Sequence, residues 1–125
     1  MSNADDNFLL PPLGRNGLVF PVILSSERAR AYKPHAAIFG RLSRALGVAG
    51  EEILYVGDSP FADVTGAKNA GLQAAWINRQ GVRPLEQSAR IVTGNEAEVD
   101  GARRVLREPD VEIDSLDRLL ELISA

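Results

Sequence analysis

A strand–helix–strand pattern between residues 53 and 77 constrains the fold of this chain more than any other feature. Residues 53–56 (ILYV) form a short, continuously apolar run that ends at Gly57-Asp58. A helix is predicted from about Ala62 to Ala70, closed by Gly71, and the apolar run from Leu72 to Ile77 predicts a second strand. Two buried strands joined by a helix at this spacing indicate a βαβ unit and a parallel sheet.

The pattern extends toward the N-terminus. Residues 8–14 predict a short helix, although they include two prolines, and Leu18–Leu24 predicts a buried strand. Pro34 suits the first turn of a longer helix that Gly47 ends. That helix presents a stripe of apolar residues at spacings of three and four, namely Ile38, Phe39, Leu42, Ala45 and Leu46.

The signal is weaker beyond Gly81. Residues 90–92 predict a short strand, and residues 95–98 (NEAE) have the form of a capping box before a helix with Val99, Ala102 and Leu106 on one face. Residues 111–113 predict an edge strand. Asp114 is expected to cap a final helix whose apolar residues face inward, namely Leu116, Leu119, Leu120 and Ile123.

Composition excludes several classes of function. The formal charge of -3 argues against non-specific nucleic-acid binding, which needs clustered Lys and Arg. The chain has no cysteine, so disulfides, thiolate metal sites and cysteine catalysis are excluded, and a reducing cytoplasm is expected. No apolar run approaches the roughly 20 residues that span a bilayer, and the acidic N-terminus is unlike a secretory signal.

Two carboxylates follow the strand at residues 53–56. Asp58 stands at the strand end and Asp63 at the start of the next helix, and ligands bind at the carboxyl ends of strands in parallel α/β sheets. Mg²⁺ takes hard oxygen ligands and keeps several waters, so one or two carboxylates suffice. Gly57 is expected to let the backbone turn tightly beneath the ion. The simpler alternative is that Asp58 is a turn residue and Asp63 a helix cap.

Lys33 precedes Pro34 at the entrance to the long helix. A lone lysine is usually a solvated surface residue, as Arg28 and Arg30 are expected to be. Here the order of elements places Lys33 near the same sheet edge as Asp58. Its ammonium would there neutralise a carboxylate or a phosphoryl oxygen.

Together these residues resemble the haloacid dehalogenase superfamily of hydrolases. Ser26-Glu27, Lys33-Pro34 and Ile38-Phe39 are similar to its third motif, and Gly57-Asp58-Ser59-Pro60 with Asp63, Gly66-Ala67 and Ala70-Gly71 to its fourth. Residues 76–79 with Gly81 resemble the following segment of its 2-haloacid dehalogenase and phosphoglycolate phosphatase-like branch. The resemblance implies catalytic Lys33, a Mg²⁺ ligand at Asp58, and Asp63 supporting the metal or its waters.

The family's nucleophile is the first aspartate of a D-x-D motif after an apolar strand, and this sequence contains no such motif. Ser2-Asn3 resembles the family's second motif, which would make Ser2 a phosphoryl-contacting hydroxyl; alternatively, Ser2-Asn3-Ala4 is a tag remnant or a disordered terminus. The expected fold is therefore an incomplete α/β Rossmann-like parallel sheet with flanking helices, lacking the nucleophile strand and the cap. Residues 1–125 would form one partial core domain, best matched over 18–81, with 82–125 as a C-terminal extension.

The resemblance implies a phosphatase-type hydrolase that acts with Mg²⁺ on a small phosphorylated substrate, and the two-acid loop favours this over carbon–halogen hydrolysis. Without the aspartate nucleophile, turnover by the chain alone is expected to be minimal. The alternatives are a non-catalytic metal-binding or protein-interaction module, a dehalogenase-type hydrolase, and a subunit completed by another chain carrying D-x-D. Open strand edges also predict a rearranged sheet or a homodimer.

Overall fold

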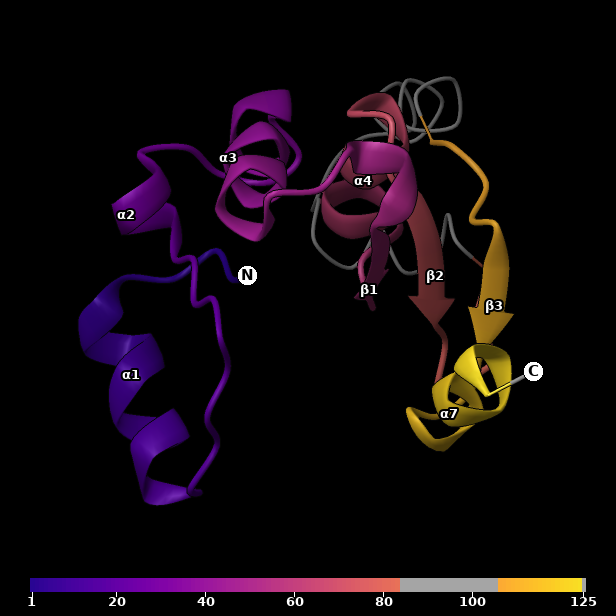
Figure 1. Cartoon of the computed structure of the whole chain (residues 1–125). Coiled ribbons are helices and arrows are strands. Elements are labelled where there is room, and N and C mark those ends of the chain that lie inside the picture. The colour runs from indigo at the N-terminus through magenta and orange to yellow at the C-terminus, as the bar shows by residue number, and fades with distance from the viewer. Residues whose placement is uncertain (84–105, 125) are drawn as a thin grey trace, which may run out of the picture.

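The computed structural model describes residues 1–83 and 106–124. It contains a three-stranded parallel sheet in the order β1 (Leu54–Gly57), β2 (Gln73–Ile77) and β3 (Val111–Ile113), with helices around it (Figure 1). This confirms the expected fold class and all three of these strands. The strand predicted at 90–92 and the capping box at 95–98 lie outside the described residues.

β2 is the central strand because its sequence is apolar on both faces. Four consecutive residues, from Ala74 to Ile77, are buried, as expected for a strand covered on both sides. β1 pairs with it from Leu54–Gln73 to Gly57–Trp76. β3 pairs on the other side, so β1 lies at one edge of the described sheet.

The connection from β1 to β2 is the predicted helix, but it begins with a wide turn. A π-helical stretch, η2 (Pro60–Thr65), leads directly into α4 (Gly66–Asn69), and the Ser59 hydroxyl caps it by accepting the Ala62 N–H at 3.0 Å. Gly66 permits close packing, because a Cβ there would lie 2.7 Å from Phe39 Cε2.

The long helix is α3 (Ala36–Leu46), and it ends as predicted at Gly47, which has φ +70°. Its residues Ile38, Phe39 and Leu42 are buried in the hydrophobic cluster that includes residues of β1 and β2. Pro34 does not occupy its first turn, because His35 is the N-cap and Pro34 lies before it. A short turn, η1 (Gly50–Glu52), joins α3 to β1.

The N-terminal part contains α1 (Asp6–Arg15), which confirms the helix predicted at 8–14, and the short α2 (Ser26–Ala29). The strand predicted at Leu18–Leu24 is wrong: this segment is extended coil, and Val19 is 90% exposed. A strand forms only where a neighbour accepts its backbone hydrogen bonds. Among the described residues, β-type pairing next to this segment is limited to one isolated bridge between Ser2 and Ser25.

The final helix is α7 (Asp117–Ile123), with Leu116 rather than Asp114 at its N-cap. Its apolar residues do not face inward as predicted: Leu116, Leu120 and Ile123 are exposed. Periodicity identified the helix correctly, but no described element covers its apolar face.

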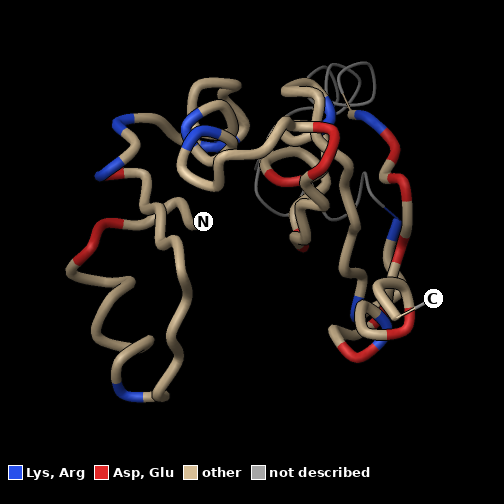
Figure 2. The backbone as a smooth tube through the Cα atoms, viewed as in Figure 1, with Lys and Arg blue, Asp and Glu red and all other residues tan. Residues whose placement is uncertain are grey.

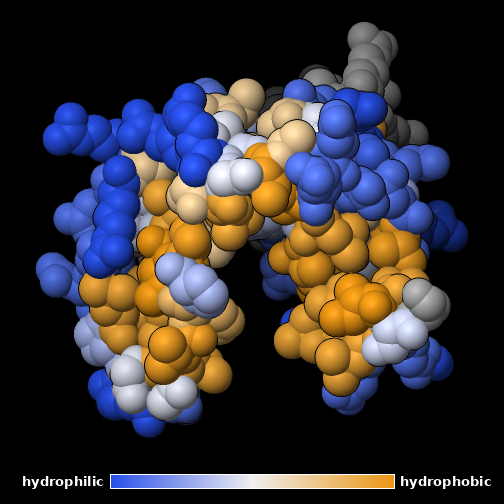
Figure 3. All heavy atoms as spheres, in the orientation of Figure 1, coloured by the Kyte–Doolittle hydropathy of each residue, from blue (hydrophilic) through white to orange (hydrophobic). Residues whose placement is uncertain are grey.

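The described elements form an arch. In Figure 1, α1 lies on one side, the sheet with α7 on the other, and α3 lies between them at the top. Figure 3 shows a hollow between the two sides, whose surfaces there are largely apolar. Figure 2 shows Lys and Arg interspersed with Asp and Glu along the chain. No helix among the described residues is long and apolar enough to cross a membrane.

Candidate functional site

Lys33 and Asp63 form the centre of the candidate site. Lys33 lies between α2 and α3, and its Nζ is 2.5 Å from Asp63 Oδ1 and 5.8 Å from the centre of the Tyr55 ring. The Lys33 side chain is 13% exposed and that of Asp63 is 5% exposed. An ion pair this well shielded from water fixes both groups, because removing either partner would leave a charge buried alone.

Asp63 is held from several directions. Its Oδ2 accepts the Ser59 N–H at 3.0 Å, so both carboxylate oxygens have partners. Burial raises the pKa of the neighbouring Tyr55, and the negative charge of Asp63 and a hydrogen bond to its carboxylate raise it further. Tyr55 is itself fixed by an edge-to-face contact with Phe39, whose ring centre lies 5.3 Å away. Ser59 is the N-cap of η2, so Asp63 is a buried ion-pair partner rather than a helix cap.

Gly57 is required for a different reason from the one predicted. Its φ is not positive, so the tight turn is not the constraint. A Cβ at this position would overlap the Asp63 carboxylate. The glycine at the end of β1 thus makes the space into which the Asp63 side chain fits.

Asp58 follows β1 directly and is exposed. Its backbone carbonyl accepts the indole N–H of buried Trp76 at 3.0 Å, which ties the loop to β2. The residue thus stands at the carboxyl ends of the strands, where the sequence placed it.

The donor set fits Mg²⁺ in a limited way. Asp58 is exposed, and both carboxylate oxygens of Asp63 accept hydrogen bonds. A Mg²⁺ ion needs only one or two protein carboxylates beside waters and phosphate oxygens. Asp58 would be the direct ligand and Asp63 would act on the waters around the ion. Within residues 1–83 and 106–124 there is no group of three or more His, Cys, Asp or Glu side chains that could hold a metal.

The structure places the Ser2-Asn3 segment beside Lys33. Ser2 N–H donates to the Leu24 carbonyl at 3.0 Å, and the Ser26 N–H donates to the Ser2 carbonyl at 2.9 Å. The hydrogen bonds to Lys33 come from Asn3 rather than Ser2. Ser2 borders an apolar cavity of about 180 Å³ beneath α1. The backbone of Ser2 is thus hydrogen-bonded to the chain that leads into α2.

Sequence reasoning did not single out Asn3, Tyr55 or Trp76 as site residues. Asn3 follows the candidate second-motif serine, and that position was the available signal. Tyr55 and Trp76 belong to the two apolar runs that predict strands. Their polar atoms acquire a role through contacts between elements, which periodicity does not encode.

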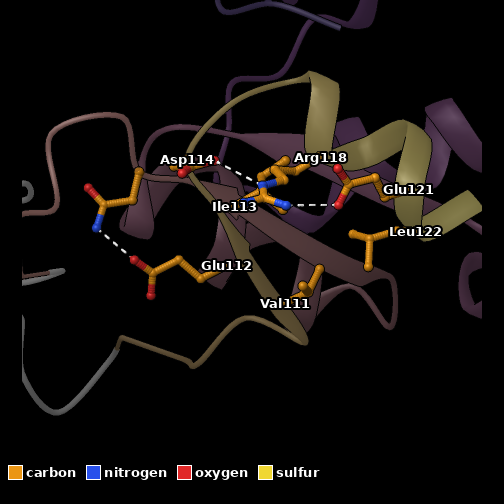
Figure 4. Close-up of a pocket in the computed structure, with 8 residues that line it drawn as sticks. Val111, Glu112, Ile113, Asp114, Arg118, Glu121 and Leu122 are labelled. Carbon is orange, nitrogen blue, oxygen red and sulfur yellow. Dashed lines mark hydrogen bonds and ion pairs between the residues drawn. The ribbon is translucent and has the colours of Figure 1, made fainter.

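A second cavity, of about 440 Å³, lies between β3 and α7 (Figure 4). Its polar side chains largely bond to one another: Arg118 pairs with Glu121 at 3.0 Å, and Asn78 donates to Glu112 at 2.8 Å. Lys33, Asp58 and Asp63 are not among its lining residues.

The described residues form a parallel α/β core in which Lys33 pairs with Asp63 and Asp58 follows the first strand. Residues 2–77 match the family described as haloacid dehalogenase-like hydrolase, and the chain belongs to that family. The matched range begins at Ser2.

Relatives in this family include both dehalogenases and phosphatases. Haloacetate dehalogenase H-2 of Moraxella sp. (strain B) is 45% identical over 62 residues, which are 50% of this chain and 27% of that protein. Phosphoserine phosphatase of Thermus thermophilus is 39% identical over 87 residues, 64% of this chain and 34% of that protein. The chain thus spans about a third of the length of these relatives.

Solved structures agree. A HAD phosphatase from Thermococcus onnurineus is 33% identical, with a TM-score of 0.67 over 89% of this chain and 43% of that one. L-2-haloacid dehalogenase from Xanthobacter autotrophicus shares the fold with a TM-score of 0.75 at 24% identity, covering 98% of this chain and 52% of that one. The described domain is therefore a partial core of this fold.

Proposed function

We propose that the chain supplies the lysine and the acidic loop of a Mg²⁺-dependent hydrolase that acts on small phosphate monoesters. The observation that carries this proposal is the shielded Lys33–Asp63 pair, with the exposed Asp58 directly after β1 on the same loop. Phosphatases among the relatives, such as that of Thermus thermophilus, support it. The lack of cysteine fits action in the cytoplasm.

Each residue has a distinct part in this proposal. The Lys33 ammonium attracts a phosphoryl oxygen and balances the charge of the carboxylates around it. Asp63 holds that ammonium in place, and Asp58 presents its carboxylate to the metal. Bound Mg²⁺ supplies positive charge that orients and stabilises phosphoryl oxygens. Ser2 is proposed to add a hydroxyl near the same phosphoryl group.

The attacking aspartate has to come from a segment other than the described ones. β1 is an edge strand, and the hollow beside it has largely apolar walls (Figure 3). An apolar strand ending in D-x-D would satisfy the backbone of β1 and cover these walls. We therefore propose that such a strand, on another chain or segment, completes the site; a homodimer that covers β1 is the alternative.

Metal binding can be measured in the chain as it stands. Trp76 is the only tryptophan and bonds the Asp58 carbonyl, so its fluorescence reports on this loop. We expect Mg²⁺ to change the emission and to release or absorb heat in calorimetry, and Asp58→Asn to abolish both responses. Asp114→Asn is the matched control, since Asp114 follows β3 as Asp58 follows β1. A flat titration of the wild-type chain would refute the metal site.

Catalysis is tested with p-nitrophenyl phosphate and Mg²⁺. The chain alone is expected to stay near background, and adding a peptide with an apolar strand ending in D-x-D should produce turnover that EDTA removes. Robust activity of the purified chain alone would refute the claim that the nucleophile must be supplied. Light scattering on the same sample tests the homodimer.

The second candidate is hydrolysis of a carbon–halogen bond, which the 45% identity to haloacetate dehalogenase H-2 favours. Halide release from chloroacetate by the complemented chain, unaffected by EDTA, would select this reaction over phosphate hydrolysis.

A further inference from the structure

The side chain of Asn3 bonds both backbone polar groups of Lys33. Its Nδ2 donates to the Lys33 carbonyl at 3.2 Å, and its Oδ1 accepts the Lys33 N–H at 2.8 Å. A carboxamide is neutral and has a hydrogen-bond donor and an acceptor on the same carbon. It can therefore bond the N–H and the carbonyl of one residue at the same time. The two bonds join residues 30 positions apart.

Asn3 is itself anchored to the chain that leads into α2. The backbone of Ser2 bonds on both sides, to Leu24 and Ser26, and the Ser26 hydroxyl donates to the Ala4 carbonyl at 3.1 Å. Ser26 is buried. The carboxamide therefore projects from a fixed segment, and the backbone that it bonds is fixed in turn.

Lysine needs such support more than most residues do. Its ammonium sits on a flexible four-carbon stem, and ordering that stem costs conformational entropy. At the far end of the stem, Lys33 Nζ meets the buried carboxylate of Asp63. Fixing the Lys33 backbone removes its conformational freedom. Only the side chain then has to be ordered for the ammonium to reach Asp63.

We propose that Asn3 is a positioning residue: it clamps the backbone of Lys33 so that the ammonium remains beside Asp63. This assignment rests on the proposed function for its importance in catalysis, but the clamp can be tested without metal or substrate. The amide acts through Lys33 and needs no contact with the reacting atoms.

The chain contains two lysines, Lys33 and Lys68, which provides an internal reference. Lys68 pairs with Asp110 at 2.9 Å, whereas the Asn3 side chain bonds the backbone of Lys33. Brief acylation of the folded, full-length chain with acetic anhydride, followed by peptide mass spectrometry, gives the ratio of labelling at Lys33 to labelling at Lys68. In the wild-type chain the paired, shielded Lys33 should label slowly.

Asn3→Ala removes both hydrogen bonds and should raise this ratio at least about fivefold, the population change expected from the loss of a single hydrogen bond. Asn16→Ala is the matched control, since the Asn16 amide also bonds a backbone carbonyl, that of Pro12 at 2.7 Å within α1. It should leave the ratio unchanged. Asn3→Asp keeps the acceptor but cannot donate to the Lys33 carbonyl, and it should still raise the ratio at least about twofold.

An unchanged ratio in Asn3→Ala would overturn the assignment. Unchanged labelling at both lysines would show that there is no clamp, and equal rises at both would show general loosening. If Asn3→Ala does not fold, as judged by circular dichroism, Asn3→Asp decides by the same criterion. A raised ratio in a chain that fails to bind Mg²⁺ would leave the clamp standing and count against the proposed function alone.

Discussion

The Lys33 ammonium and the Asp63 carboxylate, 30 residues apart in sequence, meet at 2.5 Å in a place that water barely reaches. Two segments are joined by this contact: the loop before α3 and the turn after β1. The pair fixes the charge of the site before any ligand arrives. Asp58, at the end of β1, is exposed to solvent, whereas Asp63 is buried.

Breaking this pair should cost much more than breaking a surface pair. Asp63→Asn keeps the shape but leaves the Lys33 charge without its partner, so we expect the free energy of unfolding in urea to fall by about 3 kcal/mol. Glu121→Gln breaks the exposed pair with Arg118 and should change this free energy far less. Equal effects of the two substitutions would show that Lys33–Asp63 is solvated in solution.

Gly57→Ala should be disruptive although alanine is small. The new methyl group would overlap the Asp63 carboxylate, and we expect a loss of about 1–3 kcal/mol in thermal or urea unfolding. Gly40→Ala is the control, because a Cβ in the middle of α3 meets no atom within 4 Å. It should stabilise the chain by about 0.5–1 kcal/mol, and a destabilising Gly40→Ala would contradict the packing described here.

We predict that the contacts of Asp6 with Ser25 and Arg28 are sensitive to acid. Its hydrogen bond from Ser25 lowers its pKa, and its bond and ion pair with Arg28 lower it further. A carboxyl group with a lower pKa in the folded state stabilises that state above its unfolded pKa, and this stabilisation is lost as the pH falls through the folded pKa.

The measurement is thermal stability between neutral and acidic pH. Asp6→Asn should be less stable than wild type at neutral pH and should lose less stability on acidification. Asp5→Asn removes the same charge from an N-cap residue whose side chain makes no capping hydrogen bond, and it should keep the wild-type slope. Parallel slopes for wild type and Asp6→Asn would refute the contact.

Asp110 should secure the edge strand β3. Its carboxylate accepts the Lys68 ammonium at 2.9 Å and the Ala74 N–H at 2.7 Å, and both bonds lower its pKa. Asp110→Ala should therefore speed hydrogen exchange at the Ala74 amide and along β3 several-fold. Asp114→Ala, at the other end of the strand, removes only a 3.7 Å surface contact with Arg118 and should leave these rates near wild type.

Local sequence patterns were enough to predict many of the helices and strands. The apolar run before Gly57, the helix that follows and the apolar run of β2 identified a βαβ unit. The sequence also predicted α3 and its Gly47 cap, although the helix begins at Ala36 rather than at Pro34. These features depend on side-chain periodicity and on backbone preferences of neighbouring residues, which a sequence contains directly. The same reasoning placed Asp58 and Lys33 at one end of the sheet.

Strand pairing, helix burial and contacts between distant residues were decided by the tertiary structure. Leu18–Leu24 is as apolar as β2, yet it is not a strand, because a strand needs a neighbour to accept its hydrogen bonds. The apolar face of α7 is exposed because no described element covers it. Only the folded chain pairs Asp63 with Lys33 and brings Asn3 to the Lys33 backbone, since contacts between distant residues are set by packing rather than by local sequence.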